Sequence, residues 1–159
     1  MTRTSGTHRF FFLFVILCLP VLLHAQEPVP LEPGKAIERE LAGDQSHTYQ
    51  ISLTAGQFVR FRLEQRALDA TLILTAPEGK QLVEMNLSGS GGQESLFLEA
   101  AVTGSYRLVV RGSGGATVRG GYRLEAAVQA TATALDRQRV MAQSLLLEAT
   151  LLRAQGGKT

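Results

Sequence analysis

Between positions 35 and 128 the chain alternates short apolar-rich runs with Gly, Asp, Asn, Ser and Pro. Runs that repeat about every ten residues are typical of a β-sandwich or barrel. We therefore expect one all-β domain, an antiparallel sandwich of about eight strands. The predicted strands span residues 35–41, 47–53, 57–64, 70–75, 81–85, 95–100, 105–111 and 121–128.

A five-residue phrase occurs twice, as Gly104-Ser-Tyr-Arg-Leu108 and as Gly120-Gly-Tyr-Arg-Leu124. Side chains of a strand point alternately to opposite faces, so each tyrosine and leucine is predicted to face the core and each arginine the solvent. Each tyrosine hydroxyl needs a polar partner at the rim of that core. The same alternation in "HTYQISL" and "QFVRFRLE" gives the full inward set: Tyr49, Ile51, Leu53, Val59, Phe61, Leu63, Tyr106, Leu108, Val110, Tyr122, Leu124 and Ala126.

Five motifs occur along this segment: Ala42-Gly43-Asp44 with "HTYQISL", then "TAGQFVRFRL", "LILTAPEGKQL", "SLFLEAAVTGSYRLVV" and "GGYRLEA". In this order they resemble the bacterial pre-peptidase C-terminal domain, a jelly-roll-like β-sandwich appended to secreted proteins. The resemblance covers residues 33–128. It implies a single jelly-roll-like sandwich, which we place at residues 35–129.

A helix is expected in the last segment, residues 130–159, after a short linker. Thr133 and Asp136 have the spacing of a capping box, and no Gly or Pro follows until Gly156. The helix carries an apolar stripe that we predict to be an interaction face, formed by Leu145, Ala149 and Leu152. Such a helix docks on the sandwich, pairs with another chain or couples to helical repeats. The third alternative is favoured, because a sandwich followed by such a helix resembles the start of exported proteins with tetratricopeptide repeats and a CHAT peptidase domain.

The first 25 residues have the features of a signal peptide. Arg3 and Arg9 lie in a short polar start, and an apolar run follows from Phe10 to Leu23. This run is too short to span a bilayer comfortably. We expect cleavage after Ala25, export to the periplasm or beyond, and no stable membrane span afterwards. Residues 26–34 are then a Pro-rich leader.

Loss of the signal peptide changes both the charge and the cysteine content. The whole chain has 16 Lys and Arg against 14 Asp and Glu, and removal of the two signal arginines balances them. Bulk charge therefore gives no reason to expect nucleic acid as a partner. The only cysteine, Cys18, also leaves, which excludes thiol catalysis and disulfides in the mature chain.

Candidate chemistry in the mature chain is sparse. His47 is its only histidine and is interpreted as a polar residue at a strand edge, since no spacing suggests a catalytic triad. The acidic residues Asp44, Asp69 and Glu78 are too scattered to predict a calcium site. Gly157-Lys158-Thr159 imitates the end of a P-loop but lacks its first glycine. We expect no catalytic residue, metal or cofactor.

Outward-facing arginines are the remaining candidate site. Arg60, Arg62, Arg107 and Arg123 would form a surface patch for an anionic glycan or protein, although nearby glutamates favour a solvated face. The sequence thus predicts a non-enzymatic exported interaction module that couples to repeats or to a protein partner through its helix. The alternative is a carbohydrate- or matrix-binding sandwich whose ligand is an extracellular glycan.

Overall fold

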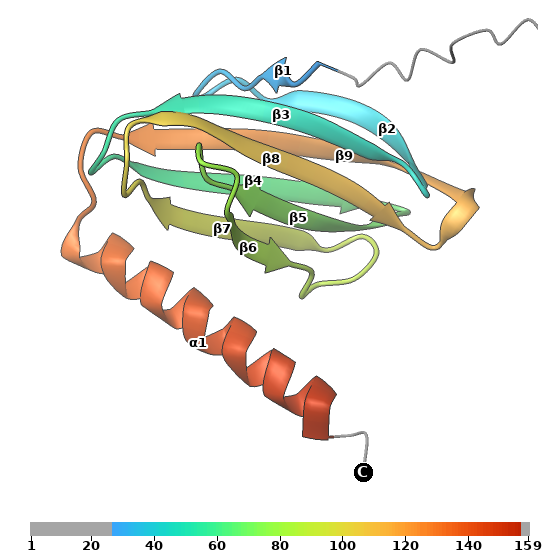
Figure 1. The fold of residues 1–159 in the computed structure, drawn as a ribbon. Coiled ribbons are helices and arrows are strands. Elements are labelled where there is room, and N and C mark those ends of the chain that lie inside the picture. The colour runs from blue at the N-terminus through green and yellow to red at the C-terminus, as the bar shows by residue number, and fades with distance from the viewer. Residues whose placement is uncertain (1–26, 157–159) are drawn as a thin grey trace, which may run out of the picture.

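The computed structural model describes residues 27–156, which form nine strands and one helix. Two sheets pack face to face in a sandwich, and the helix lies along one side of it (Figure 1). The first sheet has the strand order β1-β3-β8-β5-β6 and the second sheet has the order β2-β9-β4-β7. The strands are β1 (Val29–Pro30), β2 (Ile37–Gly43), β3 (Ser46–Leu53), β4 (Phe58–Arg66), β5 (Asp69–Thr75), β6 (Gln81–Met85), β7 (Gln93–Glu99), β8 (Gly104–Ser113) and β9 (Gly115–Gln129), and the helix is α1 (Ala134–Gly156).

The predicted inward and outward faces are confirmed. Every residue of the predicted inward set is buried, and all of them belong to one core between the two sheets. Tyr106 and Tyr122 are each 1% exposed, whereas the neighbouring Arg107 is exposed and Arg123 is partly exposed. The hydroxyl of Tyr106 donates to the carbonyl oxygen of Val102 over 2.9 Å, which is the polar contact at the rim that its burial requires.

The Pro-rich leader contributes a ninth strand that the periodicity did not predict. Val29 and Pro30 pair in parallel with Tyr49 and Gln50 of β3, whereas every other strand pairing in the described residues is antiparallel. Leu31 donates its amide to the carbonyl of Gln50 and is buried in the core. Proline is tolerated there because β1 is an edge strand, where a missing N–H costs no hydrogen bond in the sheet.

The last strand is longer than expected, because its Gly-rich first half is not a loop. β9 begins at Gly115, directly after a tight turn in which Gly114 and Gly115 have φ angles of 107° and 83°. Further along β9, a Cβ atom on Gly120 would lie 2.2 Å from the carbonyl oxygen of Arg66. Glycine at this position therefore permits a close approach between β9 and the end of β4, rather than interrupting the strand.

The helix is docked on the sandwich, although the sequence favoured an undocked one that waits for repeats. Only residues 130–133 separate the end of β9 from the start of α1. The helix contacts β7, the edge strand of the second sheet, and lies on the side of the sandwich formed by β6 and β7 (Figure 1). The described residues contain no helix that is both long and apolar enough to cross a bilayer.

Candidate functional site

A capping box fixes the start of α1, as predicted. The hydroxyl oxygen of Thr133 accepts the backbone N–H of Asp136 over 3.2 Å, and a carboxylate oxygen of Asp136 accepts the backbone N–H of Thr133 over 3.1 Å. The Thr133 hydroxyl also donates to this carboxylate, over 2.6 Å, and Arg139 pairs with its other oxygen. These contacts, led by the Thr133 hydroxyl, lower the pKa of the Asp136 carboxyl. The direction in which α1 leaves the sandwich is therefore well determined.

The side of α1 that faces the sandwich is unexpectedly polar. The side chain of Gln143 is buried, its amide oxygen accepts the backbone N–H of Phe97 over 2.8 Å, and its amide nitrogen donates to the Phe97 carbonyl over 3.1 Å. Phe97 lies on β7, so Gln143 satisfies backbone groups at the free edge of the second sheet.

An ion pair supports the same contact closer to the start of the helix. Arg137 donates two hydrogen bonds of 2.9 Å to the Glu99 carboxylate, and these bonds lower the pKa of Glu99. Val140 and Leu147 lie partly buried on the same side as Gln143. This face of the helix therefore packs against the sandwich.

The opposite side of α1 is apolar and exposed. It includes the predicted interaction face, since Leu145 and Leu152 are each 61% exposed and Ala149 is exposed as well. Met141, 66% exposed, extends this face toward the start of the helix, and Leu135 and Leu146 flank it. We call the set Leu135, Met141, Ala142, Leu145, Ala149 and Leu152 the apolar stripe.

A shallow groove separates the second half of the helix from β6. Leu82 and Leu87 line one wall, and Leu147, Thr150 and Leu151 line the other. Leu151 is 63% exposed, so the helix does not close onto β6 at this level. The groove lies beside the apolar stripe and not beneath it.

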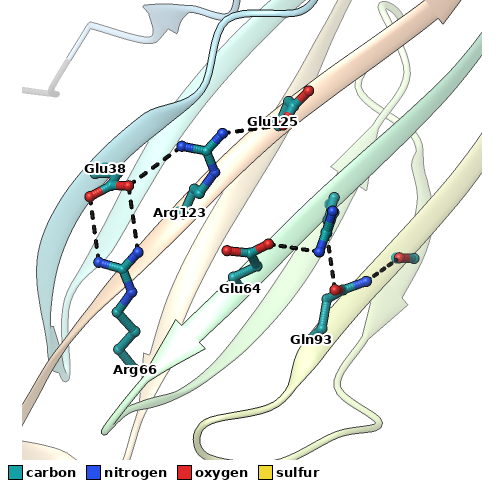
Figure 2. Close-up of polar contacts among 8 residues, drawn as sticks. Glu38, Glu64, Arg66, Gln93, Arg123 and Glu125 are labelled. Atoms are coloured by element: carbon teal, nitrogen blue, oxygen red, sulfur yellow. Dashed lines mark hydrogen bonds and ion pairs between the residues drawn. The ribbon is translucent and has the colours of Figure 1, made fainter.

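The four predicted arginines do not form one patch. Arg60, Arg62 and Arg123 lie on the outer face of the second sheet, whereas Arg107 lies on β8 of the first sheet. On the second sheet, acidic residues alternate with the arginines (Figure 2). Glu38 pairs with both Arg66 and Arg123, Arg123 also contacts Glu125, and Arg62 pairs with Glu64 over 2.8 Å. The charges on this face therefore largely neutralise one another.

A hydrogen-bonded cluster that the sequence did not reveal joins the two sheets. The Nδ1 atom of His47 lies 2.6 Å from the hydroxyl oxygen of Tyr122, which also bonds the hydroxyl of Tyr49. Burial and the positive charge of Arg39 lower the pKa of His47, which favours a neutral ring that accepts the Tyr122 proton in its Nε2-protonated tautomer. Burial, and then the bond to Tyr49, raise the pKa of Tyr122 and keep its hydroxyl protonated. This arrangement satisfies buried polar groups across the core.

The acidic residues considered for calcium do not converge on one site. Asp44 lies in the turn between β2 and β3, Glu78 lies in the turn between β5 and β6, and Asp69 begins β5 and accepts a hydrogen bond from Asn86. Within residues 27–156, no three His, Cys, Asp or Glu side chains gather in a way that would hold a metal ion. The predicted signal peptide and Gly157-Lys158-Thr159 lie outside the described residues.

Comparison with solved structures places the sandwich among known folds. The pre-peptidase C-terminal domain of collagenase from Bacillus anthracis matches with a TM-score of 0.50 and 15% sequence identity, over 63% of this chain and 94% of that domain. Aeromonas hydrophila PliG, a periplasmic inhibitor of g-type lysozyme, matches with a TM-score of 0.49 and 14% identity, over 64% of this chain and 96% of PliG. These identities show a likeness of fold alone. No family model matches the chain, and no curated protein matches it.

Proposed function

We propose that this chain is an exported, non-enzymatic β-sandwich module that binds a protein partner, or couples to helical repeats, through the apolar stripe of α1. One observation carries the proposal: the helix docks by a side that contains the buried Asp136 and Gln143, while five of its six leucines are exposed. An amphipathic helix on a protein surface normally turns its apolar face to the core and its polar face to the solvent, which is the reverse of what α1 does. Exposed apolar patches of this kind mark interaction sites.

Two further observations support parts of the proposal. Consecutive strands from β2 onward alternate between the two sheets, except for the antiparallel pair of β5 and β6 within the first sheet. This order supports a jelly-roll topology and the resemblance to the pre-peptidase C-terminal domain. The ring of His47 is hydrogen-bonded to the hydroxyl of Tyr122. This contact supports a structural role, and not a catalytic one, for the only histidine of the mature chain.

The glycan alternative has weaker support. Sugar-binding surfaces commonly present an aromatic side chain to the ring of the sugar. Here the chain has no tryptophan, and Tyr49, Tyr106 and Tyr122 are all buried. Protein binding through the helix is therefore the function that the geometry supports best.

A site-specific cross-linking experiment tests this function. A photoreactive amino acid placed at Leu145 or Ala149, in the organism that encodes the protein, is expected to give a covalent adduct with another polypeptide. The same probe at Arg107, which is also exposed but lies on the first sheet, serves as the control and should give none. Adducts from position 107 and none from the helix would refute a role for the apolar stripe.

A further inference from the structure

All residues of the apolar stripe except Met141, together with Gln138, have the spacing of a coiled-coil seam. In a heptad labelled a to g, residues Leu135, Ala142 and Ala149 fall at a, and Gln138, Leu145 and Leu152 fall at d. All six are exposed. The next most favourable register would place Glu148 at a d position, whereas this one keeps every charged side chain out of the seam. The stripe therefore fits another helix of the same kind.

The charged residues that flank the seam indicate the orientation of that second helix. Glu148 falls at g and Arg153 at e of the following heptad, which is the pair that meets across the seam of a parallel two-stranded coiled coil. In an antiparallel pair, e positions face e positions and g positions face g positions, so neither residue would meet its opposite charge. Both side chains are exposed, and neither forms an ion pair within residues 27–156. Two copies of this helix thus complement each other only when they run in the same direction.

The placement of the sandwich permits this pairing. Successive residues turn by about 100° around an α-helix, so the seam lies nearly opposite Asp136, Val140, Gln143 and Leu147, which face the sandwich. A two-fold axis along the seam would therefore place the two sandwiches on opposite sides of the helix pair. The second copy meets only the exposed side of α1.

We propose that the occupant of the apolar stripe is α1 of a second copy of this chain, in a parallel two-stranded coiled coil with Glu148 of each copy paired to Arg153 of the other. This inference rests on the proposed function and names its partner. The seam from residue 135 to residue 152 is about 27 Å long and has alanine at two a positions, so the contact is small. We expect a dissociation constant on the order of 10 to 100 µM, as for weak and transient interfaces.

Sedimentation equilibrium of the chain without residues 1–25 tests the second copy directly. The protein is expected to change from monomer to dimer between about 1 and 500 µM. Leu145→Glu should keep it monomeric throughout, because it places a charge in the seam. Leu151→Glu is the matched control, since Leu151 is as exposed as Leu145 but lies off the seam, and it should leave the association unchanged. A melting temperature for each variant verifies that the sandwich still folds.

Charge reversal and cross-linking test the orientation. Glu148→Arg and Arg153→Glu should each weaken the dimer about tenfold, since two symmetry-related exposed pairs become repulsive, and the double variant should restore it. Leu152→Cys should form an intermolecular disulfide, because equivalent d positions meet in a parallel pair, whereas Leu151→Cys should not.

Three outcomes would overturn the inference. If the chain stays monomeric at every concentration, the proposal that a second copy binds the apolar stripe is refuted. Adducts from Leu145 with a different polypeptide would in that case still support the proposed function. The parallel orientation is overturned if the chain dimerises but the double charge variant does not regain the dimer and Leu152→Cys forms no intermolecular disulfide. A dimer lost in Leu151→Glu but kept in Leu145→Glu overturns the seam itself.

Discussion

Replacing Gln143 by alanine should release the helix from the edge of β7 without unfolding the sandwich. The variant loses both hydrogen bonds to the backbone of Phe97. A neutral hydrogen bond contributes about 0.5 to 1.5 kcal/mol net, and water reaches the freed groups once the helix moves away, so the docking free energy should fall by about 2 kcal/mol. The remaining contacts are the exposed pair of Arg137 and Glu99, which contributes little by itself, and the partly buried side chains of Val140 and Leu147.

Hydrogen exchange at a single amide measures this effect. The Phe97 N–H points at the helix, so its protection reports docking, and a loss of about 2 kcal/mol corresponds to exchange roughly 30-fold faster. The amides of Leu96 and Leu98 alternate toward β4 and should keep their protection. Gln138→Ala, on the exposed side of the same helix, is the control and should change neither. Unchanged protection of Phe97 in Gln143→Ala, or equal losses at all three amides, would refute the reasoning.

Three further outcomes are expected from the core. The pKa of His47 is lowered on folding, so the unfolded chain binds more protons than the folded one as the pH falls below about 6.5. The free energy of unfolding should therefore decrease with falling pH until the lower pKa of the folded state is passed. Urea melts at several pH values measure this slope, and His47→Gln should flatten it. Tyr122→Phe removes the hydroxyl shared by His47 and Tyr49 and should cost about 1 to 3 kcal/mol in the same assay, whereas a cost below about 0.5 kcal/mol would mean that water replaces it readily. Glu94→Ala removes a buried carboxylate that accepts hydrogen bonds from the amides of Leu87 and Ser88 and from the Ser88 hydroxyl. The free energy of unfolding should therefore fall by about 2 to 4 kcal/mol, and proteolysis between residues 86 and 92 should become faster. Glu78→Ala, at an exposed position, is the control and should change neither.

The sandwich could be predicted because each half-buried strand shows the alternation of apolar and polar residues within its own few positions. Seven of the eight predicted strands match the structure with ends that agree within two residues. The failures occur where composition conceals a strand. Two prolines flank Val29 in the leader, and four glycines lie between residues 112 and 120, so neither segment shows an apolar alternation. Pairing with neighbouring strands, and not local preference, makes these residues extended.

The candidate site was only half predictable, for a related reason. The exposed leucines of α1 follow from helical spacing alone. The docked side does not, because its central residue is a glutamine, which a pattern of apolar positions cannot select. In the same way His47 and Tyr122 are 75 residues apart, and their hydrogen bond depends on how two sheets face each other. Contacts between distant polar residues leave no signal in a single sequence.

The position of β9 within the second sheet determines when this protein is able to fold. β9 is the last strand within residues 27–156, yet it lies between β2 and β4, which are not paired with each other. Until residues 115–124 have left the ribosome, β2 has no neighbour in its sheet, and β4 and β7 form an isolated pair. The sandwich of the nascent chain therefore stays open until β9 has been made, and a chain released before β9 is complete has no route to a closed sandwich.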